Sequence, residues 1–299
     1  MEEIKLTFLG TGDAIPTKKR NHTSILASFA NENILIDCGE GTQRQLRKID
    51  LSPTKITRIF ITHWHGDHIL GLPGLFQTLA LLNYQKTLKL YGPKGTKEFL
   101  QIVQSLIKRY KINLEAYEVS NETIIDEKDF KVEAKEMSHS TPAIAYSIIL
   151  KDKIRLNKSK LKKFKLPNSP IIKELQAGKD ITFNGKKIKA SQVIYKEKGK
   201  KVTFVLDTYM NSNAVELARN SDLLVTESSF HSKDLEKAKE YKHLTARHAA
   251  EIAKKSKSRK LLLTHISQRY ENNMNIIEKE AKKTFKNTKL VKDFDVVKV

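Results

Sequence analysis

The sequence has only one cysteine, Cys38, and one tryptophan, Trp64, among its 299 residues. A single cysteine cannot form an internal disulfide, and it also excludes zinc clusters built from several thiolates. Any metal must therefore be held by histidine and carboxylate side chains. We expect Cys38 to be a small core residue and Trp64 to shield a neighbouring site.

Long apolar runs are missing as well. The richest stretch, residues 69–82, is interrupted by glycine, proline, glutamine and threonine, whereas a membrane-spanning helix needs about 18 apolar residues in a row. The chain opens with Met1-Glu2-Glu3, where a secretory signal would carry basic residues. These features predict a cytoplasmic protein without membrane spans. Its length allows a large core without disulfide bonds and excludes disorder throughout.

Acidic residues are scarce, with 34 Asp and Glu against 55 Lys and Arg, a net charge of +21. Such an excess attracts polyanions, which in a cell are nucleic acids and acidic lipid surfaces. Residues 151–201 hold 17 Lys and Arg and 4 Asp and Glu, a net charge of +13. This segment also carries Pro167, Pro170 and the turn signal Asn184-Gly185. We predict an inserted, weakly cored basic arm that grips a phosphate backbone at a distance from the chemistry.

On both sides of the arm, short apolar runs alternate with helical patterns, which predicts an α/β sandwich of two sheets with outer helices. The spacing of Thr42 and Gln45 predicts a capping box at the first helix. The expected strands are residues 4–8, 24–29, 34–36, 59–62, 88–91, 130–134, 144–150, 202–206, 223–226 and 261–264. The expected helices are residues 42–49, 95–110, 213–220, 245–255 and 271–285.

The densest group of metal-binding side chains directly follows one of these strands. It reads Thr62-His63-Trp64-His65-Gly66-Asp67-His68. His63 and His65 point the same way in an extended segment, and after the Gly66 turn Asp67 and His68 can approach from the opposite side. Imidazole and carboxylate are ligands that zinc accepts, and two such ions would lie about 3.5–4 Å apart. The cluster predicts a metal site.

Four side chains cannot complete two ions, so further ligands must come from other strand ends. The candidates are His139, Asp207 and His265, each directly after an expected strand. One His or Asp at a strand end is more often a cap or a surface residue. Here, five of the nine histidines fall at the candidate positions, which favours ligation. We expect Asp37, at the end of another strand, to support the ligands by hydrogen bonding.

Further motifs lie outside the metal-binding cluster. They are Pro16-Thr17-Lys18-Lys19-Arg20-Asn21 (PxKxRN), His265-Ile266-Ser267-Gln268-Arg269-Tyr270 (HxSxRY), His139 with Pro142 and Tyr146, and, in the arm, Leu166-Pro167-Asn168-Ser169-Pro170 followed by Lys173, Leu175 and Gly178. With these motifs the sequence resembles the tRNase Z family of metallo-β-lactamase fold proteins over nearly its whole length. The resemblance implies an αββα sandwich in which residues 1–150 and 202–299 form the catalytic domain and residues 151–201 form a substrate-binding arm.

The resemblance further implies an endoribonuclease that removes the 3′ trailer from precursor tRNA, leaving a tRNA 3′-hydroxyl and a trailer 5′-phosphate. It implies a homodimer with two Zn²⁺ or Mn²⁺ ions per subunit. One ion would be held by His63, His65 and His139, the other by Asp67, His68 and His265, with Asp207 bridging them. Asp67 would orient or deprotonate the attacking water, and Glu227 with His243 would relay a proton to the leaving oxygen. The implied substrate-binding residues are Pro16, Lys18, Arg20, Asn21, Ser267, Arg269 and Lys173.

The sequence departs from the family pattern at four places. Glu227 lacks the histidine that normally precedes it, Asp207 lacks the preceding glycine, and Asn168-Ser169 replaces glycine in the arm. His243-Leu244-Thr245 keeps only the first and third residues of the family's HST motif. Two other functions stay open. One is a metallo-hydrolase of the same fold acting on a small phosphodiester, lactone or thioester, which has no use for a basic arm. The other is a non-catalytic RNA-binding protein with a structural metal, although structural sites usually surround one ion completely.

Overall fold

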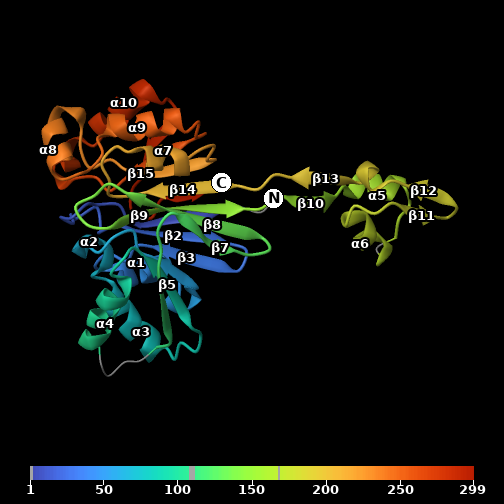
Figure 1. Cartoon of the computed structure of the whole chain (residues 1–299), viewed down its shortest axis with the longest axis horizontal. Helices are drawn as coiled ribbons and strands as arrows, with labels where there is room; N and C mark the ends of the chain where they lie inside the picture. Colours follow the sequence, from blue (N-terminus) through green and yellow to red (C-terminus); the bar gives the residue numbers. More distant parts are fainter. Residues whose placement is uncertain (1–2, 108–111, 168) are drawn as a thin grey trace.

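The computed structural model describes residues 3–107, 112–167 and 169–299. Two seven-stranded sheets pack face to face, and helices cover both outer faces (Figure 1). This architecture confirms the predicted αββα sandwich. Among the described residues, no helix combines the length and apolarity needed to cross a bilayer.

The two sheets are each continuous in space but not in sequence. The first sheet has the order β18 (Val296–Lys298), β1 (Lys5–Gly10), β2 (Ser24–Phe29), β3 (Glu32–Ile36), β4 (Arg58–Phe60), β5 (Leu88–Gly92) and β6 (Leu114–Glu118). The second has the order β17 (Thr288–Leu290), β16 (Leu261–Thr264), β15 (Leu223–Glu227), β14 (Lys201–Val205), β9 (Ala143–Leu150), β8 (Phe130–Met137) and β7 (Glu122–Asp126).

The helices divide between the two outer faces. An apolar cluster beneath the first sheet receives α1 (Thr42–Lys48), α3 (Leu72–Leu81) and α4 (Thr96–Leu106). A second cluster, on the outer side of the other sheet, receives α7 (Ser212–Leu217), α9 (Ala246–Lys255) and α10 (Asn275–Thr284). The remaining short helices of the body are η1 (Pro53–Lys55), α2 (Gly66–Ile69), η3 (Ser232–Asp234), α8 (Leu235–Glu240) and η4 (Gln268–Asn273).

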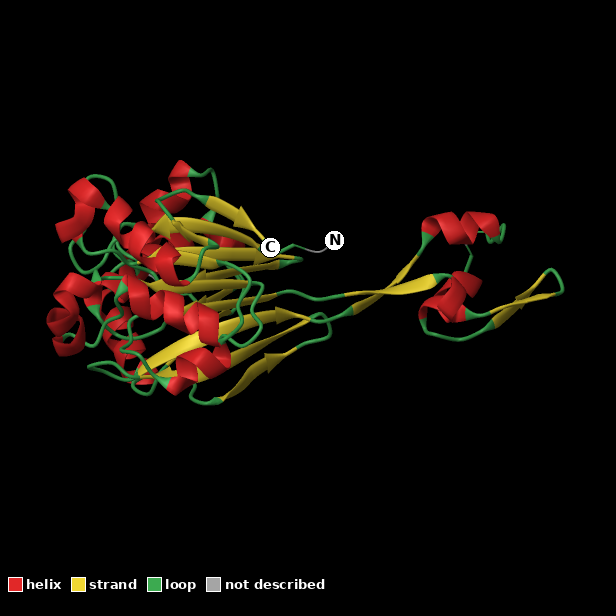
Figure 2. Ribbon diagram, turned by 90° about the horizontal axis from the view of Figure 1, so that it is seen from above, coloured by secondary structure: helices red, strands yellow, loops and turns green. Residues whose placement is uncertain are grey.

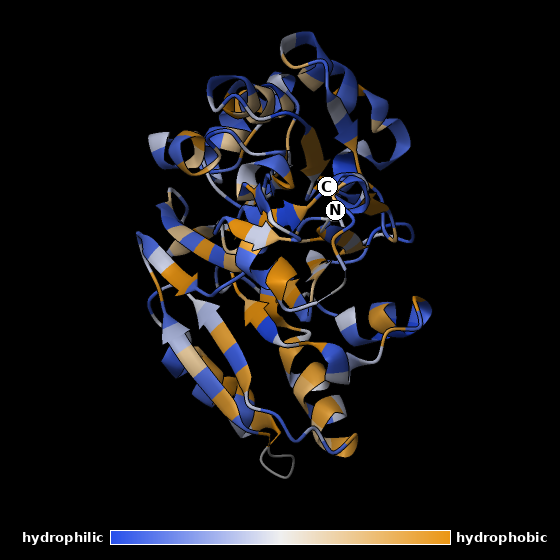
Figure 3. Cartoon of the chain, turned by 90° about the vertical axis from the view of Figure 1, so that its right-hand side faces the viewer, coloured by the Kyte–Doolittle hydropathy of each residue, from blue (hydrophilic) through white to orange (hydrophobic). Residues whose placement is uncertain are grey.

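The main core lies between the sheets. Buried and partly exposed residues alternate along β8, as the period of two in a strand requires, and Figure 3 shows the same alternation of hydrophobic and hydrophilic bands along the strands. The rings of Phe60 and Tyr146, from opposite sheets, stack at 5.0 Å. The buried hydroxyl of Tyr146 donates to the carbonyl of Ile61 at 2.7 Å. This bond fixes the second sheet to the chain two residues before His63.

Strand direction brings the predicted ligands to one edge of the sandwich. In the first sheet β3 and β4 run parallel. In the second sheet β14, β15 and β16 run parallel, and β8 points the same way because β9 is antiparallel to both β8 and β14. The carboxyl ends of parallel strands meet at one edge, where α/β proteins bind their ligands. The candidate side chains follow the carboxyl ends of β3, β4, β8, β14 and β16.

The arm leaves from the opposite edge, because it connects the end of β9 to the start of β14. Its stalk is the antiparallel pair β10 (Lys153–Leu156) and β13 (Ile194–Glu197). Figure 2 shows the arm projecting well away from the sandwich. Its tip holds α5 (Lys158–Lys163), α6 (Ile171–Gln176), β11 (Ile181–Phe183), β12 (Lys186–Ile188) and η2 (Ala190–Gln192) around a small core of Leu175, Ile181, Ile188, Ala190 and Val193.

The predicted strands and helices are all present, with shifted ends. The Asn184-Gly185 turn is confirmed, since both residues have positive φ and join β11 to β12. The predicted helix 95–110 is α4, and residues 108–111 lie outside the described part of the chain. The capping box predicted for Thr42 and Gln45 is wrong.

At the start of α1 the N-cap is Gly41, with a φ of +77°. Thr42 lies inside the helix and donates to the carbonyl of Gly39, while Gln45 donates to the carbonyl of Leu9 on β1. Tertiary hydrogen bonds therefore use both side chains. A capping box forms instead at α9, between Thr245 and His248.

Several elements were not predicted. Strands β6 and β7 are largely exposed edge segments rich in glutamate, and β17 and β18 have only three residues each. Helix α3 contains Pro73 and Gly74, which read as helix breakers in the sequence. A proline in the first turn is compatible with a helix because that N–H has no intrahelical partner.

Glycine 71 allows α3 to approach the loop that follows β3. A Cβ at Gly71 would lie 2.2 Å from the carbonyl oxygen of Gly39 and 2.8 Å from that of Cys38, whereas a Cβ at Gly74 would meet only the end of the Gln43 side chain. We expect Gly71→Ala to lower the free energy of unfolding by about 1–3 kcal/mol through overpacking. Gly74→Ala is the matched control and should change it by about 1 kcal/mol or less. Urea denaturation of both variants measures the difference; equal stabilities would contradict this account of the contact.

Candidate metal centre

Three of the strand ends at the shared edge turn sharply. Asp37 after β3, Asp207 after β14 and His265 after β16 all have positive φ, of 57°, 27° and 54°. Residues other than glycine rarely adopt this conformation, and it costs of order 1–3 kcal/mol each. All three side chains are buried. The backbone is thus held in an unfavourable conformation where it directs polar groups inward.

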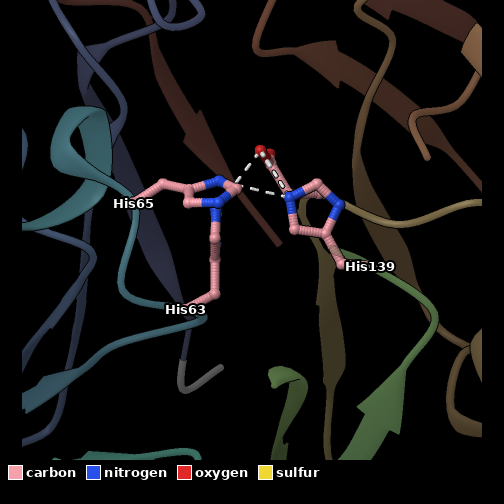
Figure 4. Close-up of side chains that lie close together, drawn as sticks. His63, His65 and His139 are labelled. Atoms are coloured by element: carbon pink, nitrogen blue, oxygen red, sulfur yellow. Dashed lines mark hydrogen bonds and ion pairs between the residues drawn. The ribbon is translucent and has the colours of Figure 1, made fainter. Parts of the chain in front are cut away.

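The first donor group consists of His63, His65, His139 and Asp207, whose donor atoms all lie within 4.8 Å of one another. Figure 4 shows the imidazoles of His63, His65 and His139 converging on one point. Oδ2 of Asp207 lies 3.5 Å from Nε2 of His63 and 4.0 Å from Nε2 of His139. Nδ1 of His65 lies 3.3 Å from Nε2 of His139.

The second donor group consists of Asp67, His68, Asp207 and His265, again within 4.8 Å of one another. Oδ2 of Asp67 lies 3.2 Å from Nε2 of both His68 and His265. Oδ1 of Asp207 lies 3.2 Å from Nε2 of His265, and its Oδ2 lies 3.5 Å from Nε2 of His68. The carboxylate of Asp207 is therefore shared between the two groups.

Two observations fit divalent cations at these positions. Nε2 of His63 and Oδ1 of Asp207 are buried without a hydrogen-bond partner, which is costly unless another group satisfies them. The Nε2 atoms of His68 and His265 face each other at 3.2 Å. Nδ1 of each ring already has a hydrogen-bond partner, so both Nε2 atoms are left to bind a cation. Imidazole nitrogens and carboxylate oxygens are the donors that zinc and manganese accept.

Neighbouring groups fix the ring orientation of the ligands. Asp37 accepts hydrogen bonds from the backbone N–H and the hydroxyl of Thr62, at 2.7 and 2.8 Å, and from Nδ1 of His68 at 2.7 Å. Nδ1 of His139 donates to the carbonyl of Lys242 at 3.1 Å. Each bond uses the ring nitrogen that faces away from the centre, so Nε2 faces inward. Asp37 is placed as predicted, beside the ligands and not among them.

The electrostatics of the centre keep its carboxylates ionised. Burial disfavours the charged form of Asp207, but neighbouring imidazoles, including His265 and His68, outweigh it and hold the pKa of Asp207 well below its usual range. The pKa of Asp67 is lowered in the same way. Burial, reinforced by the adjacent His68, lowers the pKa of His63 well below that of free imidazole. Ionised carboxylates and a neutral imidazole are the states that bind metal.

A second cluster lies beside the donor groups. Glu227, which is fully buried, accepts hydrogen bonds from the backbone N–H of Thr208 and the hydroxyl of Ser229, both at 2.7 Å. Nδ1 of His243 lies 3.1 Å from each of its oxygens. Burial acts against the charge on His243, but Glu227 and Asp207 raise its pKa to about 9. The orientation of Glu227 is thus defined although the histidine before it is missing.

The centre opens into a cavity of about 500 Å³. Its floor includes donors of both groups, and its wall includes Ser267 and Arg269 of the HxSxRY motif and residues 13–15, which directly precede the PxKxRN motif. The lining residues are Asp13, Ala14, Ile15, His65, Asp67, His139, Ser140, Asp207, Ser229, Phe230, Glu240, Tyr241, His243, His265, Ser267, Gln268 and Arg269. A molecule larger than water can therefore reach the donors from outside.

The predicted substrate-binding residues are not all at the surface. Pro16 and Lys18 are exposed, but Arg20 is only 5% exposed. The guanidinium of Arg20 donates to the hydroxyl of Thr11 at 2.6 Å and to the carbonyl of Val291 at 2.8 Å. Nη1 of Arg20 is therefore bonded inside the protein, and the contact of Arg20 with RNA stays a prediction.

The other predicted contacts also fall into separate places. Asn21 is half-buried and donates to the carbonyl of Glu40 at 2.7 Å, which fixes the loop 16–21 to the body. Ser267 and Arg269 line the cavity. Lys173 is exposed on α6 in the arm and does not line the cavity. The structure thus brings the predicted metal ligands together, whereas the predicted substrate-binding residues lie in three separate regions.

Two supporting residues were missed in the sequence. Asp293 accepts hydrogen bonds from the Thr11 hydroxyl at 2.6 Å and the Asn21 N–H at 2.8 Å, and so holds the loop 16–21. Lys242 contacts His139 both through its carbonyl and through Nζ, which donates to the carbonyl of His139 at 3.1 Å. No local motif signals either contact, because both join segments more than 100 residues apart.

Comparisons with known proteins fit this geometry. The family described as "Anti-Pycsar protein Apyc1" matches residues 4–166. A ribonuclease Z from Nanoarchaeum equitans is 40% identical over 271 residues, which cover 89% of this chain and 84% of that protein. The crystal structure of human tRNase Z, short form, has a TM-score of 0.71 and 27% identity, covering 98% of both chains. The metallo-β-lactamase fold protein YhfI from Bacillus subtilis has a TM-score of 0.74 at 18% identity and full coverage.

The hydrogen bonds of Asp37 predict its contribution to metal affinity. Asp37→Asn removes the charge and turns an amide NH₂ toward at least one of the three groups that donate to Asp37, so we expect metal affinity to fall about 10- to 100-fold. Titration with a chelating competitor measures this. Asp222→Asn is the control, because Asp222 accepts from the N–H of Lys201 at the opposite ends of the strands. Unchanged affinity in Asp37→Asn would contradict the supporting role.

Proposed function

The chain belongs to the ribonuclease Z family and, over residues 4–166, to the family described as anti-Pycsar protein Apyc1, and we propose that it removes the 3′ trailer from tRNA precursors as an endoribonuclease. It is a hydrolytic nuclease of the metallo-β-lactamase fold. The observation that carries the proposal is the convergence of two metal-donor groups on Asp207 at the floor of an open cavity. The basic arm on the same chain supports an RNA substrate.

Two Zn²⁺ ions, or two Mn²⁺ ions, would occupy the centre. His63, His65 and His139 would hold one, Asp67, His68 and His265 the other, and Asp207 would bridge them. Bound there, the ions would lower the pKa of a shared water toward ~7 and stabilise negative charge on the phosphoryl oxygens. Orientation of the attacking water and transfer of protons are proposed to depend on protein side chains.

Asp67 is the residue placed to handle the proton of the attacking water. Its Oδ2 faces both His68 and His265 at 3.2 Å, and the residue lines the cavity. An ionised carboxylate in this position can accept a hydrogen bond from water and orient it for in-line attack on the phosphorus. We propose this orienting and proton-accepting role for Asp67.

Glu227 and His243 are placed to supply the proton of the leaving 3′-oxygen. Glu227 is held by Thr208 and Ser229 and contacts Nδ1 of His243. Because His243 lines the cavity and its Nδ1 is bound to Glu227, its Nε2 is available to donate to the leaving oxygen. The products are a tRNA with a 3′-hydroxyl and a trailer with a 5′-phosphate.

The exposed Lys18 and the cavity residues Ser267 and Arg269 are our candidates for contacts to the RNA around the cut. Arg20 is proposed to act indirectly, by holding the loop that carries Lys18. Its guanidinium and the carboxylate of Asp293 fix the loop 16–21 from inside, so that Pro16 and Lys18 stay at the surface. Arg20 and Asn21 are therefore proposed to position the loop.

The arm is proposed to bind the duplex part of the tRNA. A-form RNA offers little sequence information in its deep groove, so recognition depends on shape and on phosphate contacts. Lys173 and its neighbours on the arm supply positive charge far from the cavity. Contact at two separated points, arm and cavity, would fix the position of the cut. We propose that the enzyme meets this substrate in the cytoplasm.

Strand topology favours a homodimer. The arm leaves from the edge opposite to the metal donors (Figure 2), so the arm of one chain points away from its own cavity. One precursor tRNA that must reach both would be served by the arm of one copy and the cavity of the other. We therefore propose that the active unit contains two chains.

The two alternatives explain less of the molecule. A small-molecule hydrolase would need the donor groups and the cavity but neither the arm nor its net charge of +13 over residues 151–201. A non-catalytic RNA-binding protein would need the arm, whereas a structural metal site is closed by protein ligands. Here, donors of both groups line an open cavity.

Incubation with a 3′-extended precursor tRNA tests the function. We expect one cut, with a 3′-hydroxyl on the tRNA and a 5′-phosphate on the trailer. Removal of metal by a chelator should abolish cleavage, and Zn²⁺ or Mn²⁺ should restore it. Asp67→Ala should lower the rate roughly 10²- to 10⁴-fold, with Asp222→Ala as a control for a distant carboxylate. Metal-independent cleavage, or a cyclic phosphate at the new end, would contradict the mechanism.

Replacement of the arm tests substrate binding. Because β9 and β14 are antiparallel neighbours, residues 153–197 can be replaced by an Asn-Gly turn while Asp152 and Gly199 stay paired. We expect this variant to lose precursor tRNA cleavage and to retain hydrolysis of a small aryl phosphodiester. Binding of the wild type should weaken with salt with a log–log slope of roughly −0.7 to −0.9 per phosphate neutralised, and the armless variant should show a shallower slope.

A mixture distinguishes a dimer from a single working chain. The armless variant has an intact cavity, and full-length Asp67→Ala has an intact arm. If the arm acts on the partner's cavity, co-refolding of the two should restore cleavage that neither shows alone. Undiminished cleavage by the armless variant by itself would refute the role of the arm.

A further inference from the structure

We infer that one wall of the cavity is a stacking platform for an unpaired base that flanks the scissile phosphate. The platform consists of Tyr241, Phe230 and Arg269. The inference rests on the proposed function, since it assigns a site for part of the RNA substrate. None of the motifs in the sequence analysis assigns a role to Tyr241 or to Phe230.

The geometry is that of an aromatic surface beside the reaction centre. All three residues line the same cavity as Asp67, Asp207 and His265. The rings of Tyr241 and Phe230 are nearly parallel, at 11°, with centroids 6.5 Å apart. The guanidinium of Arg269 lies over the Phe230 ring at 5.0 Å. Phe230 is buried, whereas Tyr241 is 53% exposed, so Tyr241 is the ring that a ligand can cover.

Tyr241 is tied closely to the metal centre. It is the C-cap residue of α8, and its N–H donates to the carbonyl of Lys237 at 2.9 Å. The next residue, Lys242, is bonded to His139 through both its carbonyl and its Nζ. The residue after that, His243, contacts Glu227. A platform anchored in this way keeps a fixed distance from the reacting phosphate, as a positioning surface must.

The chemistry of the wall suits a base better than a phosphate. Every nucleobase has a π-face, so stacking on aromatic rings and on arginine accepts any sequence. An enzyme that acts at one position in many RNAs needs this tolerance. Glu240 lies on the same wall, and its carboxylate would repel a phosphate but can accept a hydrogen bond from the amino group of a base. Arg269 already faces Asp234 at 3.8 Å.

Substitution of Tyr241, combined with removal of a base, tests the platform. Tyr241→Leu keeps apolar volume but removes the ring, and Tyr241→Phe keeps the ring. On precursor tRNA we expect Tyr241→Leu to lower kcat/KM about 5- to 150-fold and Tyr241→Phe to change it less than about 2-fold. A precursor with an abasic nucleotide on one side of the cut should lose a similar factor with the wild type. On that RNA, Tyr241→Leu should cause no further loss.

The control is Tyr117→Leu. Tyr117 is also partly exposed and stacks on another ring, Tyr91, at 4.8 Å, but it does not line the cavity. We expect its kcat/KM to match the wild type. A fluorescence measurement uses the Asp67→Ala background, which keeps the RNA intact, and RNA with 2-aminopurine at the flanking position. Binding should quench the 2-aminopurine fluorescence when Tyr241 is kept or changed by Tyr241→Phe. The fluorescence should remain high with Tyr241→Leu.

The outcomes separate the two proposals. If the wild type leaves precursor tRNA intact, the proposed function fails. If the wild type cleaves precursor tRNA, two results would refute the platform. One is a Tyr241→Leu variant with unchanged kcat/KM; the other is the same loss of kcat/KM on intact RNA and on RNA that is abasic at either flanking position. The platform is supported if, at one flanking position, the abasic nucleotide and Tyr241→Leu together lower kcat/KM no more than either does alone.

Discussion

The carboxylate of Asp207 is the group on which the arrangement of the centre depends. It is buried at a strained strand end, and it lies within 4.0 Å of imidazoles supplied by both sheets. A buried carboxylate is stable only where positive or hydrogen-bonding groups surround it. His63 and His68 from one sheet, with His139 and His265 from the other, surround this carboxylate, but its Oδ1 still lacks a hydrogen-bond partner. The same convergence creates two donor groups that share one residue, which is the geometry that a pair of cations needs.

The sandwich positions this site by simple means. Parallel strands end together, so side chains that follow β4, β8, β14 and β16 reach one edge although they are up to 202 residues apart in the chain. The hydroxyl of Tyr146 and the carboxylate of Asp37 then fix the loop after β4 from two sides. Burial of Cys38 beside Asp37 raises the pKa of its thiol to about 12, so this cysteine packs as an apolar residue. Contacts of the core thus continue into the edge that carries the donor groups.

Much of the site could be predicted, because its signals are local. The spacing of His63, His65, Asp67 and His68, together with polar residues directly after apolar runs, indicated the side chains that the fold gathers into two donor groups. Contacts between distant segments left no such signal. The capping box at Thr42 was wrong because the side chain of Gln45 donates to a carbonyl of β1. The hydrogen bonds of Arg20 to Thr11 and Val291 also had no signal in the sequence. The charge of a residue and the motif around it do not predict its hydrogen-bond partner in a distant segment.

The sequence by itself determined the class of ligand, the alternation of strands and helices, and the basic segment, since these depend on residue type and on spacing along the chain. Only the tertiary structure decided that the arm leaves from the edge opposite to the donors and that Tyr241 lines the same cavity as the donor groups. These properties depend on strand direction and on packing between segments far apart in the chain. Such contacts are fixed by the burial of the whole core, and no short stretch of sequence contains them.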